Sequence, residues 1–425
     1  MKNVKYYSAL LSLIVVHNIS NGQQRTNVDV NMFNEFRVEQ GELKLTSYRT
    51  LNSFFTTKTS TYLSQATDLS LSKAYAVLDN TDGRLFIGGT FNQKKKNSDF
   101  SRFLFTLGAK ANVKDGFSKI FASNTFNNDI GLSLKTTLFG RGTIWFNKDT
   151  DPKSQKEKVA HKRAQLNNEL LNEFKDELAK FKANQVSSEE AANELTAYID
   201  DSEEEKKEKF ATEEAKFLIK KKLFNVSHTW WLSLDAYVPV TKSTYEITPD
   251  FKSTKSNTED YRPYEVNLVY TNFWEKNIWT NNPLLWKGTT LLTFKGSLIA
   301  NNSVGASMID EYGFDKYLVQ NTIIDTMFLA KLKNNTVYVG DFEKFVTPKL
   351  SARFVYMPVS FIGVSCAVEK SFGKIDDFNW RLGLPVSLKD NEGKAKVNFE
   401  IIWKEVHKDH IVGLSVGLPI GQTIF

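Results

Sequence analysis

The C-terminal stretch of this chain alternates between apolar and small or polar residues almost without interruption. One parity holds Val412, Leu414, Val416, Leu418 and Ile420, and the other holds Gly413, Ser415, Gly417, Pro419 and Gly421. Side chains of a β-strand point alternately to opposite faces, so this period of two predicts a strand with one apolar face. In a soluble protein such a face covers a core, and in a membrane barrel it contacts lipid.

The same alternation recurs along most of the chain. It predicts strands over Phe103–Ala111, Ile130–Leu134, Trp230–Val238, Tyr264–Tyr270, Leu292–Leu298, Ile362–Val368, Leu382–Leu388 and Ala395–Trp403. Many of these segments approach the roughly 9 to 11 residues that a tilted strand needs to cross a membrane. With the weaker candidates included, we expect about 12 to 16 antiparallel strands, with about 14 as the best estimate.

The chain closes on an aromatic residue, Phe425. An alternating last strand with a terminal aromatic resembles the closing strand of bacterial outer-membrane β-barrels, whose assembly machinery reads that end. The resemblance implies an all-β, antiparallel transmembrane barrel that contacts outer-membrane lipid, with an assembly signal at Val416, Leu418, Ile420 and Phe425. One departure is that Phe425 has the opposite parity to Val412–Ile420. The abundance of Lys, Asn and Phe resembles proteins of low-GC Bacteroidota.

The N-terminus has the organisation of a secretory signal. Lys2 and Lys5 flank the start of an uncharged apolar run, Tyr6–Val16, and small residues in Ser20–Gly22 precede a cleavage site before Gln23. A single membrane anchor is the alternative, but the run is short for a bilayer core of about 30 Å. We therefore expect a signal peptide over residues 1–22, followed by export to the outer membrane.

Composition limits the remaining function classes. Hydrophobic residues make up 41% of the chain and the mean hydropathy is −0.36, which is too polar for a helical membrane protein. Aromatic residues reach 13%, in keeping with the aromatic girdles of barrels. The formal charge of +6 is too small and too dispersed to indicate nucleic-acid binding.

Motifs for catalysis are not found. The chain has no H-E-x-x-H, G-x-S-x-G or P-loop pattern. His407 and His410 flank a predicted turn, where a solvated pair is a simpler interpretation than a metal site. The single cysteine, Cys366, lies on an apolar parity, so it is expected in lipid or core. We expect no enzyme activity, cofactor or metal.

A charged helical segment interrupts the strands. Leu166, Leu170 and Phe174 recur at helical spacing, Ser187 with Glu190 forms a capping box, and Ser202 is a candidate start for a third helix. The predicted layout is an irregular lead at 23–42, a first barrel part at 43–150, a coiled-coil-like helical hairpin or small bundle at 151–222, and a second barrel part at 223–425. The insert is either a solvated loop domain or a docking surface for a partner.

If the apolar parity faces lipid, the other parity lines a lumen. The predicted lining residues are Lys135, Asp235, Glu265, Asn267, Lys295, Arg381, Lys396, Asn398, Glu400 and Lys404. This mixed, mildly basic set suits a water-filled passage for small polar or anionic solutes. The alternative is that the charges pair and hold the lumen shut. The glycines of the last strand leave room either for a wider pore or for a plug.

Two hypotheses of function follow. The first is a porin-like passive channel. The second is a closed scaffolding barrel whose helical insert docks a partner in an envelope complex. A soluble β-sandwich or lectin-like protein remains the rival fold, since its strands also alternate. Long barrel loops are usually extracellular, which favours that side for the insert, whereas counting strands back from a periplasmic C-terminus places it in the periplasm.

Overall fold

A computed structural model of the chain describes residues 48–59, 62, 63, 65, 68–79, 84–92, 102–112, 130–140, 142–145, 152–183, 189–240, 242–249, 257–277, 287–313, 317–321, 326–330, 336–390, 395–406 and 409–423. The predicted signal peptide at 1–22, the lead at 23–42 and Phe425 lie outside these residues.

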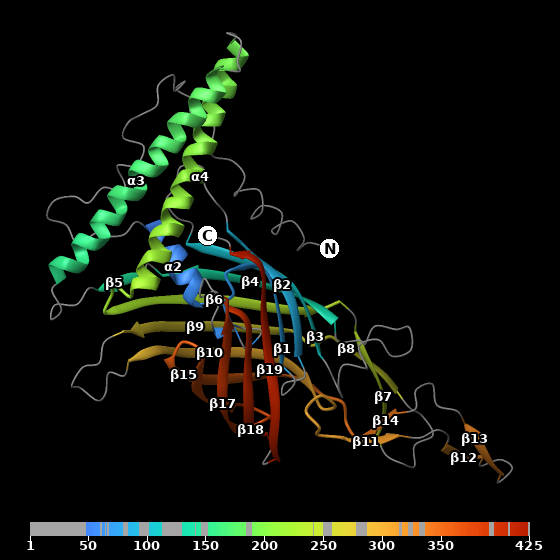
Figure 1. Cartoon of the computed structure of the whole chain (residues 1–425). Coiled ribbons are helices and arrows are strands. Elements are labelled where there is room, and N and C mark those ends of the chain that lie inside the picture. Colours follow the sequence, from blue (N-terminus) through green and yellow to red (C-terminus); the bar gives the residue numbers. More distant parts are fainter. Residues whose placement is uncertain are drawn as a thin grey trace.

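Twelve strands form the wall of a closed antiparallel barrel (Figure 1). They are β1 (Ser72–Asp79), β2 (Arg84–Asn92), β3 (Phe103–Asn112), β4 (Ile130–Phe139), β6 (Val226–Pro239), β9 (Glu265–Lys276), β10 (Gly288–Asn302), β15 (Lys344–Val359), β16 (Ile362–Ser371), β17 (Phe378–Lys389), β18 (Ala395–Val406) and β19 (Asp409–Thr423). Closure is direct, because β1 pairs with both β2 and β19, and β4 pairs with both β3 and β6. The short β5 (Thr143–Trp145) extends the β4 side of this wall and also pairs with β6.

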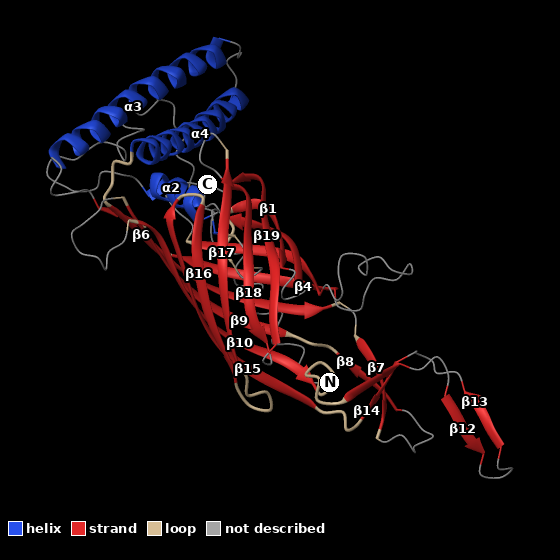
Figure 2. Cartoon of the chain, turned by 60° about the horizontal axis from the view of Figure 1, so that its bottom comes forward, coloured by secondary structure: helices blue, strands red, loops and turns tan. Residues whose placement is uncertain are grey.

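The predicted all-β barrel with a helical insert is confirmed, and the strand number lies inside the expected range but below the best estimate. The difference arises because the short strands at 243–261 and 310–339 lie outside the wall. There, β11 (Asp310–Gly313), β14 (Thr336–Val339), β7 (Ser243–Thr248) and β8 (Asn257–Tyr261) form a small sheet, and β12 (Tyr317–Asn321) pairs with β13 (Thr326–Ala330). Figure 2 shows these strands extending from one end of the barrel.

The apolar parity of the wall faces outward. Large side chains from around the barrel are half exposed, among them Leu132, Leu234, Leu268, Leu384 and Leu414. Cys366 is exposed on the same outer surface. The opposite parity is buried, as in β9, where buried and exposed residues alternate from Glu265 to Tyr270. The interior of this barrel is therefore polar and its exterior apolar.

The wall begins at Ser72, not near residue 43 as the predicted layout had it. The preceding helix α2 (Tyr48–Thr59) sits at one end of the barrel. Leu51, Phe54 and Phe55 recur at helical spacing and are buried, which makes α2 amphipathic rather than a strand. A weakly patterned wall strand was predicted where the chain instead forms a helix that packs inside the barrel mouth.

The helical insert is a hairpin of two long helices, α3 (Pro152–Ala183) and α4 (Glu189–Lys221). The expected third helix at Ser202 is wrong, since α4 continues through that position and Ser202 is buried in the seam, hydrogen-bonded to Glu177. Leu166, Leu170 and Phe174 pack there against Ile199 and Phe210. None of the helices in the described ranges is both long and apolar enough to cross a membrane.

The hairpin projects from the end of the barrel at which β19 ends and β1 begins (Figure 1). The small sheet of β7, β8, β11 and β14 lies at the other end. The strand count therefore places the hairpin on the side of the C-terminus, against the expectation from usual loop lengths. The count rests on β4 and β5 running in the same direction along β6, with the register shifted by one residue between Phe139 and Thr143.

Candidate functional site: the closed lumen

The inner face of the barrel carries paired charges. Lys110 on β3 donates a hydrogen bond of 2.7 Å from Nζ to Glu265 Oε2 on β9, and both side chains are almost fully buried. On neighbouring strands Asp235 accepts from Ser133 at 2.9 Å and from the Asn267 amide at 3.3 Å. These contacts tie β3, β4, β6 and β9 together across their inner faces.

A second cluster of charges centres on Glu400 of β18, whose side chain is inaccessible to solvent. Arg353 Nη2 and Arg381 Nη2 each lie 3.0 Å from Glu400 Oε2. Arg381 also lies 3.6 Å from Asp79, and Ser365 hydrogen-bonds Glu400. A buried carboxylate is stable only with such partners, so this cluster fixes β1, β15, β16, β17 and β18 relative to one another.

The chain upstream of β1 occupies the lumen. We call residues 48–71 the plug, meaning α2 and the described positions between it and Ser72. Arg353 Nη1 holds the Asp68 carboxylate at 3.2 Å, and Lys135 Nζ donates to the Asp68 carbonyl at 3.0 Å. The Thr90 hydroxyl donates to the Ser70 carbonyl at 2.8 Å. Wall residues that could line an open channel are therefore bonded to the plug.

An apolar core seals the mouth next to the hairpin. Plug residues Phe54, Phe55 and Leu69 pack with Phe273 of the wall and Leu218 of α4 in one buried cluster. The ring centroids of Phe54 and Phe55 are 5.1 Å apart, and those of Phe55 and Phe273 are 6.0 Å apart, both in edge-to-face geometry. Plug, wall and hairpin thus share a single core at this end of the barrel.

Buried charges also join the plug to the hairpin. Glu214 of α4 lies 2.6 Å from Arg163 of α3 and accepts a hydrogen bond from Thr50 of α2. A second pair links Arg49 to Glu204 at 2.9 Å. Burial raises the pKa of the Glu214 carboxyl above its ordinary value, and the Arg163 guanidinium offsets only part of that rise.

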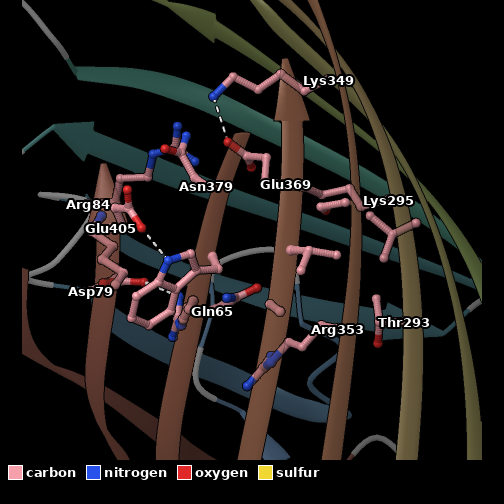
Figure 3. Close-up of a pocket in the computed structure, with 17 residues that line it drawn as sticks. Gln65, Asp79, Arg84, Thr293, Lys295, Lys349, Arg353, Glu369, Asn379 and Glu405 are labelled. Atoms are coloured by element: carbon pink, nitrogen blue, oxygen red, sulfur yellow. Dashed lines mark hydrogen bonds and ion pairs between the residues drawn. The ribbon is translucent and has the colours of Figure 1, made fainter. Parts of the chain in front are cut away.

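A cavity of about 260 Å³ opens in the lumen (Figure 3). Its lining residues Asp79 and Arg84 lie where β1 ends and β2 begins, at the end of the barrel away from the hairpin. Its lining includes six basic side chains, Arg84, Lys295, Lys349, Arg353, Arg381 and Lys404, and three acidic ones, Asp79, Glu369 and Glu405. Lys349 Nζ lies 2.8 Å from Glu369 Oε1. Gln65 of the plug also lines the cavity. The cavity is therefore polar, lined by charged side chains of the wall and bounded on one side by the plug.

The structure places most of the predicted lining residues inside the barrel. Lys135, Asp235, Glu265, Asn267, Arg381, Asn398 and Glu400 are buried, and Lys295 and Lys404 line the cavity. Lys396 differs, being exposed near the start of β18. Of the predicted assembly signal, Leu418 and Ile420 are exposed on the outer face, Val416 is half-buried there, and Phe425 lies outside the described residues.

Several important residues were missed by the sequence reasoning. Arg353 lies on a long strand that was not predicted. It shares one face of that strand with Ser351 and Val355, and this alternation is a signal that could have identified the strand. Asp68 sits in the plug, where no periodicity marks a lumen contact. Lys110 alternates with Ala109 and Ala111, so the period of two is a signal that could have identified it as an inward-facing residue. Among the residues that the structure describes, no group of three or more His, Cys, Asp or Glu side chains could hold a metal ion.

Comparisons with known proteins add the following. No protein-family model matches the chain, and no curated protein matches it. Among solved structures it is similar to the β-domain of the Bordetella autotransporter BrkA, with 7% sequence identity and a TM-score of 0.24. The match covers 81% of this chain and 93% of that chain. Similarity at this level does not bear on function, and the compositional resemblance to Bacteroidota proteins gains no support from it.

Proposed function

We propose that this protein is an integral outer-membrane β-barrel. The support is the belt of half-exposed leucine, phenylalanine and valine side chains around a closed wall. A closed barrel pairs every wall strand on both edges, which is the condition for a β-sheet in lipid. An even number of antiparallel strands is also usual for bacterial barrels.

Within that membrane, the geometry best supports a closed scaffolding barrel. The observation that carries this proposal is the plug. Residues 48–71 share a buried core with the wall and the hairpin, and Asp68 of the plug contacts the side chains of Arg353 and Lys135. The barrel then anchors the α3–α4 hairpin at the membrane surface, where it is available to a partner in an envelope complex. We propose no catalytic role.

The porin-like channel is the second candidate, and one observation favours it. The polar inner wall continues past the plug into the charged cavity at the far end. Small polar solutes could enter there, and passage would require the plug to leave. Such a channel would be gated rather than permanently open.

Planar-bilayer conductance of the refolded mature chain tests the proposal, with heat-modifiable gel mobility as the control for folding. We expect a heat-modifiable species without steady current steps. Discrete steps proportional to salt concentration would overturn the closed barrel and support the porin-like channel. A chain that shows no heat-modifiable species would count against the membrane barrel itself.

The scaffolding role needs a separate experiment on the hairpin. Replacing residues 178–201 by a short Gly-Ser linker removes the distal hairpin and keeps Arg163, Glu204 and Glu214, which contact each other or the plug. We expect this variant to fold and remain closed while losing co-purification of a partner that the full chain recovers from its native envelope. Equal recovery by both chains would contradict docking at the distal hairpin.

A further inference from the structure

Six basic and three acidic side chains line the cavity beyond the plug, and the carboxylates of Glu265, Asp68 and Glu400 contact three of the basic ones. Among its lining side chains, Lys349 is paired with Glu369, and Arg381 is shared between Asp79 and Glu400. Arg84 lies 3.8 Å from Glu265, which Lys110 already engages. Lys295 forms no hydrogen bond or ion pair with the residues that the structure describes, although its charge acts on the Glu265 carboxylate across the lumen.

Two of the guanidinium groups are held away from bulk water. Arg353 and Arg381 have side chains only about one tenth exposed, at 11% and 10%. Ionic attraction is stronger in such partly buried sites than at an open surface, since solvent and salt screen it less. Guanidinium groups also present paired N–H donors that match the oxygens of phosphate or carboxylate groups. A basic cavity of this size and polarity is suited to a small anion.

We propose that this cavity is a binding site for a small multivalent oxyanion, with Lys295 and Arg353 as its principal ligands. Lys295 supplies an ammonium group that no described carboxylate contacts directly, and Arg353 supplies a guanidinium that also contacts Glu400 (Figure 3). Arg353 also holds Asp68 of the plug at 3.2 Å. A bound anion therefore competes with the Asp68 carboxylate for the same guanidinium.

Isothermal titration of the purified, refolded chain in non-ionic detergent tests this site, with sodium pyrophosphate as the probe. The measurement does not depend on membrane insertion or conductance, so its failure is distinguishable from failure of the scaffolding proposal. Sodium chloride at matched ionic strength provides the control for screening. A parallel titration with succinate shows whether the site prefers phosphoryl or carboxylate oxygens.

Three variants make the test specific. Lys295→Met is expected to weaken binding by about tenfold, as the loss of one charge-assisted contact implies. Lys396→Met is the matched control, because Lys396 is an exposed wall lysine that does not line the cavity. Asp68→Asn is expected to tighten binding, because it removes the carboxylate that competes for Arg353.

Saturable, one-to-one binding of pyrophosphate or succinate that Lys295→Met weakens and Lys396→Met leaves unchanged supports the site. Heat no greater than that of sodium chloride overturns it. Equal losses in Lys295→Met and Lys396→Met also overturn it, because they indicate a general charge effect. Gel mobility of each variant before and after heating establishes that the barrel is folded.

Discussion

At the scale of single residues, the contact between Glu214 and Arg163 is a buried ion pair within the helical hairpin, next to the plug. Both side chains are almost inaccessible to solvent, and Thr50 donates the remaining hydrogen bond to the carboxylate. An ion pair of this kind contributes little net stability when intact, since desolvation offsets the attraction. Removing one member is costly, because the other charge remains buried without its partner. Plug docking therefore depends on keeping both.

Arg163→Met should lower the free energy of unfolding of the hairpin and α2 by about 3 kcal/mol, the usual cost of breaking a buried pair. The measurement is the helical circular-dichroism signal during urea titration in detergent. Lys209→Met is the matched control, because its pair with Glu173 is largely exposed and is expected to contribute at most about 0.5 kcal/mol. Equal effects of the two substitutions would refute the importance of the buried pair.

The same carboxyl gives a pH dependence with a defined sign. Because burial raises the pKa of Glu214 in the folded chain above 4.5, the folded state disfavours ionisation more than the unfolded state does. Its contribution to stability is complete below pH 4.5 and is lost as the pH rises through the folded pKa. Glu214→Gln lacks this titration.

Urea titrations of wild type and Glu214→Gln across pH 4 to 8, a range chosen to span roughly the ordinary carboxyl pKa and neutrality, measure that contribution. The stability of wild type relative to the variant should fall as the pH rises. Other carboxyls cancel in this difference, including Glu173, whose pKa is lowered by its hydrogen bond to Lys209. A difference that is constant, or that increases with pH, would contradict the prediction.

At the scale of elements, the closing strand β19 shows how a glycine admits the plug. A Cβ atom added at Gly417 would lie 2.1 Å from the Leu63 carbonyl oxygen, which is a severe clash with backbone. Gly417→Ala is therefore expected to push the plug from the wall and to produce intermittent bilayer conductance. At Gly296 the nearest neighbouring atom of a Cβ would be 3.7 Å away, so Gly296→Ala should remain closed. Identical conductance of the two variants would rule out this contact as a determinant of closure.

Elements that follow the period of two could be predicted from the sequence. The parity of β9, β17 and β18 indicated which residues face inward, because an apolar outer surface and a polar interior impose opposite requirements on alternate positions. The plug could not be predicted in the same way. Its burial depends on contacts with strands more than a hundred residues away, such as Asp68 with Arg353, and the local pattern of α2 covers only 12 residues.

The charge pairs within the lumen also could not be predicted from local sequence patterns. Parity placed Glu400 and Arg381 on the inner face, but it could not select their partners, which depend on the stagger of neighbouring strands. Parity is for this reason compatible with both an open and a closed lumen. The contacts that support closure come from Arg353, which lies in a strand without a clear alternating pattern.

At the scale of the whole molecule, the two ends of the barrel are built differently. At the hairpin end, apart from the hairpin, the wall strands are joined by residues 93–102, 277–287, 360–361 and 390–394. The far end has short turns at 80–83, 372–377 and 407–408, but it also has the two longest of these other connections, 240–264 and 303–343, which hold the small sheet. Bacterial barrels usually have short periplasmic turns and longer extracellular connections. Apart from the hairpin itself, this asymmetry predicts that the hairpin end faces the periplasm.

Labelling of single cysteines in intact Gram-negative cells tests that orientation. In a Cys366→Ser background, a membrane-impermeant maleimide should label Thr258→Cys, which lies exposed on β8 at the far end. Lys180→Cys, exposed on α3, should react only after the outer membrane has been permeabilised. Labelling of Lys180→Cys in intact cells would reverse the orientation and place the hairpin outside. The cavity would then open toward the periplasm, and its anion would have to come from that compartment instead of from the medium.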